Sequence, residues 1–293
     1  MTPSLLTIAR RALTGEGALE RGSVLLIAVS GGPDSMALLH VLARLAPKLA
    51  LEVRAHGVDH GLRSEAAGEL DLAEAFAGKL GVPFARSLVR VAPGGNLQAR
   101  ARTARYAALA DAARAAGTKA VATAHHADDR AETVLLRLLR GAGPRGLAVL
   151  PPRAPLGTTA LELVRPFLRA RRSVVIAHVD RHAVPFARDP SNEDPRYLRT
   201  RVRHEVLPLL AELSPGIFEH LTALADQLTS EGADASTSFP LPRSTQTALV
   251  ELMQSRSRTA RVWLPGGLVA TVDPGARAAG SQKALAKGGQ ASD

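Results

Sequence analysis

The amino-acid sequence predicts an α/β protein with a doubly wound parallel sheet, followed by a smaller, mainly helical C-terminal part. Residues 24–29 (VLLIAV) form a continuous apolar run, which is typical of a strand buried on both faces of a parallel sheet. The turn-forming run SGGPDS at 30–35 ends this strand, and apolar residues then recur at helical spacing from Met36. Because strand, loop and helix repeat along the chain, we expect ligands beyond the carboxyl ends of the strands.

The alternation continues through most of the chain. Further strands are expected at 51–58, 84–91 and 119–124, with helices at 64–80, 96–116 and 127–140. A short apolar segment at 161–164 precedes helices at 170–182, 195–211 and 215–231. Pro208 lacks the backbone N–H of a helix interior and therefore predicts an interruption in the second of these.

Composition predicts three regions along the chain. Residues 1–214 are expected to form the main α/β domain, 215–274 a small region of helix and β-structure, and 275–293 a disordered tail. The Ser-, Thr- and Pro-rich segment 230–244 is typical of a linker, and VWLPGGLVATV at 262–272 indicates a hairpin.

The chain is strongly basic and lacks cysteine. Its 37 Lys and Arg residues against 27 Asp and Glu residues give a formal charge of +10, which favours a polyanionic partner or simply reflects a biased composition. The lack of Cys excludes disulfides, thiolate metal sites, iron–sulfur clusters and cysteine nucleophiles. The N-terminus does not resemble a secretory signal and no apolar run is long enough to span a membrane, so we expect a cytoplasmic protein with no membrane partner.

SGGPDS predicts a phosphate-binding loop at a strand-to-helix turn. Its glycines allow close approach of an anion, and the following helix offers free N–H groups. The loop is neither GxxxxGK[ST] nor GxGxxG. Asp34 could hold Mg²⁺ against phosphates, although Asp34 and Ser35 would also serve as helix-capping residues. The expected ATP-binding residues are Ser30, Gly31, Gly32, Pro33, Asp34 and Ser35.

Five further blocks occur in order after SGGPDS. They are VDHGLRSEA at 58–66, ARARTARYAAL at 99–109, TAHHADDRAETVLLRLLRGAGPRGL at 123–147, VRPFL at 164–168 and DPSNEDPRYLRTRVRHEVLP at 189–208. SGGPDS resembles the PP-loop of the N-type ATP pyrophosphatases, a Rossmann-like fold, and the wider pattern resembles the tRNA(Ile)-lysidine synthases. The resemblance covers about residues 24–210.

The resemblance implies an ATP-dependent C–N ligase that requires ATP and Mg²⁺. Such an enzyme adenylates the wobble cytidine of a CAU-anticodon isoleucine tRNA and couples it to L-lysine, releasing diphosphate and AMP. Adenylation converts the cytidine oxygen into a good leaving group. The sequence leaves open whether the enzyme is a homodimer.

Polar residues after the fourth strand supply further candidates. Asp128 and Glu132 are four residues apart and share a helix face, near the same sheet edge as SGGPDS. They could bind Mg²⁺ or the lysine amines, or they could simply stabilise the helix N-terminus; a zinc site is a weaker alternative. The catalytic candidates are Asp34, Arg105, Asp129 and Glu132, and the lysine-binding candidates are His125, Asp128 and Glu132.

Arginine residues complete the candidate site. Arg105 could neutralise charge on the leaving diphosphate, because the loop has no Lys of its own, or it could be an ordinary surface residue. Residues 165–204 contain ten Arg against four acidic residues, a local excess of +6 that favours a phosphate backbone and salt-sensitive binding. The tRNA-binding candidates are Arg196, Arg199, Arg201 and Arg203.

Two alternatives remain at this stage. Another PP-loop tRNA-modifying enzyme, such as a thiolase, would also be basic and bind ATP, although such enzymes commonly use thiols or iron–sulfur clusters. A catalytically silent nucleotide- or RNA-binding module could retain the same fold. The retained Asp34, Ser35, Asp129 and Glu132 argue against the silent module.

Overall fold

The computed structural model describes residues 3–15, 18–59, 61, 65–91, 95, 97–157, 159–188, 196–234, 261–263 and 269–271. The chain divides into two compact units, Met1–Asp234 and Ala235–Asp293. In the second unit, β7 (Arg261–Trp263) pairs antiparallel with β8 (Val269–Thr271), as the hairpin pattern predicts. The expected tail at 275–293 lies outside the described residues.

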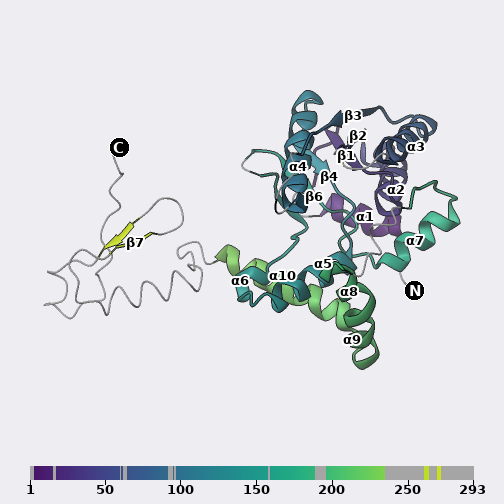
Figure 1. Cartoon of the computed structure of the whole chain (residues 1–293). Helices are drawn as coiled ribbons and strands as arrows, with labels where there is room; N and C mark the ends of the chain where they lie inside the picture. Colours follow the sequence, from purple (N-terminus) through teal and green to yellow (C-terminus); the bar gives the residue numbers. More distant parts are fainter. Residues whose placement is uncertain are drawn as a thin grey trace, which may run out of the picture. The chain divides into compact units, whose positions relative to one another are not determined.

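A six-stranded sheet organises the first unit, in the order β3-β2-β1-β4-β6-β5 (Figure 1). All neighbouring strands pair in parallel except β5, which runs antiparallel to β6 at the edge. The apolar β1 lies between β2 and β4, so that loops after these strands share one edge of the sheet. The strands are β1 (Val24–Val29), β2 (Glu52–Asp59), β3 (Phe84–Leu88), β4 (Ala120–Ala122), β5 (Arg153–Pro155) and β6 (Glu162–Val164).

Helices cover both faces of this sheet, which confirms the predicted doubly wound α/β fold. The helices α1 (Leu5–Thr14), α2 (Pro33–Leu49), α3 (Glu65–Lys79) and α7 (Arg172–Arg181) contribute to one core cluster with β1. On the other side, α4 (Leu97–Ala115) packs Leu109 and Ala113 against Leu26 and Val121. The sheet is therefore buried between two helical layers.

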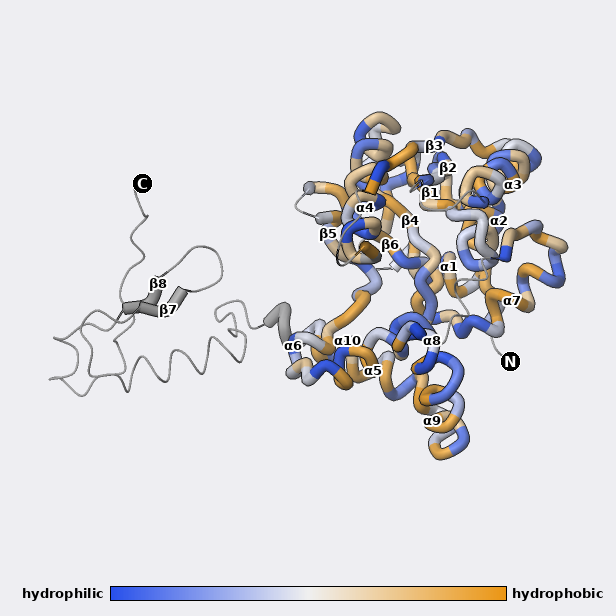
Figure 2. Tube along the Cα trace, in the orientation of Figure 1, coloured by the Kyte–Doolittle hydropathy of each residue, from blue (hydrophilic) through white to orange (hydrophobic). Residues whose placement is uncertain are grey.

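A separate helical cluster is built on α5 (Ala127–Leu139). It includes α6 (Pro144–Leu147), the turn that directly follows α8 (Leu198–Arg201), α9 (Leu207–Leu213) and α10 (Ile217–Asp234). Figure 2 shows hydrophobic and hydrophilic segments alternating along α9 and α10, as expected for helices with one buried face. Leu221 and Ala225 of α10 belong to the same core cluster as Ala131 and Val134 of α5. Helix α10 is thus part of the first unit, although it lies beyond the domain boundary expected at residue 214.

Several elements differ from the sequence-based expectation. Helix α1 was not expected, although Leu5, Ile8 and Leu13 follow helical spacing and are buried. The edge strand β5 was not expected either. The helix expected at 195–211 consists of α8, a π-helical turn at Val202–Val206 and α9. The irregular turn lies directly before Pro208, which has no N–H to donate.

Candidate functional site

The loop after β1 adopts a conformation suited to an anion. The Ser30 N–H donates to Ser35 Oγ at 3.1 Å, and Ser35 Oγ donates to the Gly32 carbonyl at 3.0 Å. Gly31 has φ +81°, and a Cβ added there would lie 2.7 Å from the Glu69 carbonyl oxygen. Gly32 is the N-cap of α2 and provides no side-chain cap, so the first N–H groups of α2 remain available to a phosphate.

Asp34 lies at this loop with an oxygen left unpaired. Its Oδ1 is buried without a hydrogen-bond partner among the described residues, although the side chain as a whole is 32% exposed. Burial raises the pKa of Asp34, an effect that nearby His126 opposes and Asp129 reinforces. The described residues contain no group of three or more His, Asp or Glu arranged to hold a metal ion. A cation at Asp34 would therefore need further ligands from phosphates.

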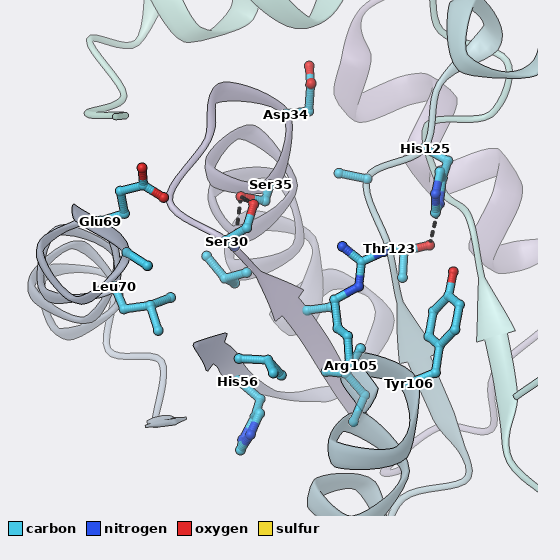
Figure 3. A pocket seen from close by; sticks show the side chains of 16 residues that line it. Ser30, Asp34, Ser35, His56, Glu69, Leu70, Arg105, Tyr106, Thr123 and His125 are labelled. Carbon is cyan, nitrogen blue, oxygen red and sulfur yellow. Dashed lines mark hydrogen bonds between the residues drawn. The ribbon is translucent and has the colours of Figure 1, made fainter. Parts of the chain in front are cut away.

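A cavity of about 530 Å³ opens over this loop. Ser30, Asp34 and Ser35 line it together with Arg105 from α4 and His125 from the end of β4 (Figure 3). Its remaining lining residues come mainly from β1, β2, α3 and α4 and are largely apolar. The predicted convergence of the phosphate loop with Arg105 and His125 is therefore present in the fold.

The two adjacent histidines after β4 have different environments. His126 is the N-cap of α5: its Nδ1 accepts from the Asp129 N–H at 3.3 Å, and its own N–H donates to Asp129 Oδ2 at 3.1 Å. His125 Nδ1 lies 3.0 Å from Thr123 Oγ1. Burial lowers the pKa of His125 to about 3, so this imidazole is neutral at physiological pH.

Glu132 and Asp129 are paired with arginines from distant sequence. Glu132 is only 1% exposed, and its carboxylate accepts from Arg199 Nε at 2.7 Å and from Arg203 Nε at 2.6 Å. Arg199 also reaches Asp129 Oδ1 at 3.2 Å. Two of the four predicted tRNA-binding arginines thus compensate the buried carboxylates of the site.

The side chains of Asp128 and His125 line different cavities. Asp128 accepts from the backbone N–H of Arg172 at 2.7 Å and pairs with Arg171 Nε at 3.3 Å. Together with Glu132 it lines a second cavity of about 250 Å³, whereas His125 lines the larger one. The three predicted lysine-binding residues therefore do not line a single cavity.

The other two predicted tRNA-binding arginines are exposed. Arg196 is exposed, and Arg201 pairs with Glu205 one helical turn away, through Nη2 and Oε2 at 2.8 Å. Sequence reasoning did not assign roles to His126 or Arg171. His126 could have been identified from the capping-box pattern. In this pattern the residue before a helix exchanges hydrogen bonds with an acidic residue three positions later.

Comparison with known proteins identifies the family. Residues 6–210 match the model of the PP-loop domain family. The chain is 43% identical over 231 residues to a tRNA(Ile)-lysidine synthase of Thermobifida fusca, covering 78% of this chain and 68% of the relative. It is 40% identical over 235 residues to a tRNA(Ile)-lysidine synthase of Symbiobacterium thermophilum, covering 78% of this chain and 48% of the relative.

A solved structure shows the same fold. It is a U34-tRNA thiolase with its [4Fe-4S] cluster, from Methanococcus maripaludis, with a TM-score of 0.64 and 18% identity, covering 77% of this chain and 78% of that one. That likeness concerns the fold alone, and this sequence contains no Cys. No helix in the described part of the chain is long and apolar enough to cross a membrane.

The extent of these matches defines what the chain shares with its relatives. It spans about half of the Symbiobacterium relative and about two thirds of the Thermobifida relative. The matched region includes the phosphate loop, Arg105, the residues after β4 and the arginines of α8, all within 6–210. The chain belongs to the PP-loop domain family and, within it, to the tRNA(Ile)-lysidine synthases.

Proposed function

We propose that this chain is an ATP-dependent ligase that adenylates the wobble cytidine of CAU-anticodon isoleucine tRNA and joins it to L-lysine, with release of diphosphate and AMP. The main supporting observation is the cavity that combines the phosphate loop, Asp34 and Arg105. The acidic residue Asp129, which lies near Asp34, could attract a cationic amine. All these groups come from one chain, so the proposal needs no homodimer, and we place the reaction in the cytoplasm.

In the first step, the cytosine carbonyl oxygen at C2 attacks the α-phosphorus of ATP and diphosphate leaves. The loop N–H groups and the N-terminus of α2 would bind phosphate oxygens. Arg105, which lines the same cavity, would neutralise the charge that develops on the leaving diphosphate.

Mg²⁺ fits this site through Asp34. An ionised carboxylate beside phosphates is repulsive without a cation, and the Asp34 Oδ1 makes no hydrogen bond to a described residue. The ion, when bound by Asp34 and ATP, would supply charge neutralisation. The protein's own contribution is to hold the carboxylate against the loop.

In the second step, the lysine ε-amine attacks C2 of the activated base, and the C2–O bond breaks to expel AMP. The amine must lose a proton, and His125 is a weak base because its pKa is about 3. Burial alone would raise the pKa of Asp129, but His126, His125 and Arg199 lower it by more, so Asp129 stays ionised and is a candidate to orient the cationic amine rather than to receive its proton. His125, Asp128 and Glu132 remain candidates for contacts with lysine.

Arg196, Arg199, Arg201 and Arg203 are proposed to contact the tRNA. Arg201 is exposed and could bind a phosphate directly. Arg199 and Arg203 would have to contact phosphates while keeping their bonds to Glu132, because a buried carboxylate without partners is costly. This arrangement would connect tRNA binding to the charge around Glu132.

The proposal is tested with α-labelled ATP, labelled lysine and CAU-anticodon isoleucine tRNA transcript. Stoichiometric AMP release and lysine incorporation are expected from the wild type, and neither from Asp34→Ala. AMP release without lysine incorporation would assign the chain to another PP-loop reaction. If neither product forms under conditions where a full-length relative is active, the silent-module alternative is correct.

A further inference from the structure

Tyr106 lines one wall of the large cavity and has no role in the proposed chemistry. Arg105 and Tyr106 extend from α4 toward the end of β4, where Thr123 and His125 lie (Figure 3). The Tyr106 hydroxyl is buried and has no hydrogen-bond partner among the described residues. Because a buried polar group without a partner is costly, such a hydroxyl in a ligand cavity indicates a hydrogen bond made with the ligand.

The surroundings of Tyr106 are positive. The guanidinium carbons of Arg102 and Arg105 lie 5.0 and 5.5 Å from the Tyr106 ring centroid. Arg165, at the end of β6, is only 5% exposed; its Nη1 donates to the Pro151 carbonyl at 2.6 Å, while its Nε has no partner among the described residues. Arg102 and Arg165 lie outside the cavity lining and make its surroundings positive, whereas Arg105 and the Tyr106 hydroxyl line the cavity and offer hydrogen-bond donors to a ligand.

His125 adds no positive charge to this wall. Its half-buried imidazole is neutral because desolvation lowers its pKa, and Arg165, Arg102 and Arg105 all oppose its protonation. The acidic groups Asp34 and Asp129 lie instead on the side of His126, within 3.8 and 3.4 Å of its Nε2. A cationic amine is therefore favoured on the acidic side, and an electron-rich, uncharged group on the Tyr106 side.

We infer that Tyr106 recognises the target cytosine of the proposed reaction by donating its hydroxyl proton to the acceptor edge of the base. This edge consists of the ring carbonyl oxygen and the adjacent unprotonated N3. Uracil carries a hydrogen on N3, which would face the donors of this wall. Tyr106 is thus a specificity-determining residue that distinguishes cytosine from uracil, because a site built around donors rejects a base that presents another donor.

Tyr106→Phe separates this role from a structural one. It removes a hydroxyl that makes no hydrogen bond to any described residue, so the unliganded protein should unfold at the same temperature as the wild type or at a higher one. The chain's only other tyrosine, Tyr197, is exposed and provides the matched Tyr197→Phe control.

The readout is the affinity for two anticodon stem-loop RNAs that carry cytidine or uridine at the wobble position. It is measured with a non-cleavable α,β-methylene analogue of ATP present, so that the cytidine RNA is not adenylated. The wild type and Tyr197→Phe should prefer the cytidine RNA, and Tyr106→Phe should lose about tenfold of that preference. The affinity for ATP alone should not change.

Three results would overturn the inference: no preference in the wild type, an unchanged preference in Tyr106→Phe, or weaker ATP binding in that variant with the preference retained. Lysine incorporation by the wild type tests the proposed ligase separately. A preference that depends on Tyr106 without lysidine formation would refute the ligase and retain the base-binding wall.

Discussion

Arg203 donates from Nε to Oε1 of Glu132 at 2.6 Å, although 71 residues separate them in the sequence. Arg199 donates to the other carboxylate oxygen at 2.7 Å, so two guanidinium groups from the α8 region neutralise one buried acid on α5. The basic stretch that the sequence assigns to RNA is thereby also part of the structure around the site. Charge in this region has two functions, stabilising α5 and presenting arginines near the cavity.

Glu132→Gln should destabilise the protein. Removing the charge leaves Arg199 and Arg203 without their shared buried partner, and we expect a loss of about 2 kcal/mol or more in the free energy of unfolding. Urea denaturation measures this change. Glu205→Gln is the matched control, because its pair with Arg201 is exposed and should have no measurable effect. Equal stability of the two variants would contradict this account of Glu132.

Asp34→Asn should inactivate the enzyme while stabilising its fold. Loss of the carboxylate should lower ATP-dependent turnover by about a hundredfold or more. Because burial raises the folded-state pKa of Asp34, its ionisation disfavours the folded state as pH rises through that pKa. The variant should therefore have the higher melting temperature at pH 7, and the difference should shrink as pH falls toward the unfolded-state pKa. A less stable variant at pH 7 would contradict this sign.

Gly31→Ala should be much more damaging to folding than Gly32→Ala. At Gly31 the new Cβ would meet the Glu69 carbonyl oxygen at 2.7 Å with φ at +81°. The strained backbone conformation alone costs about 1–3 kcal/mol. At Gly32 the nearest atom, Ser30 Oγ, is 3.8 Å away and φ is −73°. Thermal unfolding of both variants tests the comparison, and equal losses would mean that the Gly31 contact is not decisive.

His178→Gln should reduce the acid sensitivity of the fold. Burial lowers the pKa of His178 to about 4, with contributions from His182, His40, Arg44 and Arg181. Between pH 6.5 and about 4, His178 binds a proton in the unfolded chain but not in the folded chain. The free energy of unfolding therefore decreases as the pH is lowered through this window. Urea midpoints across the window should therefore fall less steeply in the variant. Replacement of the exposed His220 by Gln should leave the slope unchanged.

Arg201→Ala should weaken tRNA binding without changing stability. Loss of one phosphate contact should reduce the slope of log affinity against log salt by about one. Arg114→Ala is the control, since Arg114 is also exposed and pairs with a nearby acid, Asp111, on α4. Filter binding across salt concentrations measures both slopes. Identical slopes for Arg201→Ala and the wild type would exclude Arg201 from the RNA contact.

The sequence by itself determined the local elements and the chemistry of the loop. Apolar runs and helical spacing located β1, α2 and α5, because burial imposes distinct periods on strands and helices. SGGPDS predicted the turn in which Gly31 adopts positive φ. The sequence did not predict α1 or β5, whose roles depend on what they pack against.

Only the tertiary structure decided which residues meet. The strand order places β4 beside β1 and thereby brings His126 within 3.8 Å of Asp34. Packing of α8 beside α5 pairs Arg199 and Arg203 with Glu132, and the same folding separates Asp128 from His125. Such pairings depend on long-range packing and desolvation, which composition and local periodicity do not encode.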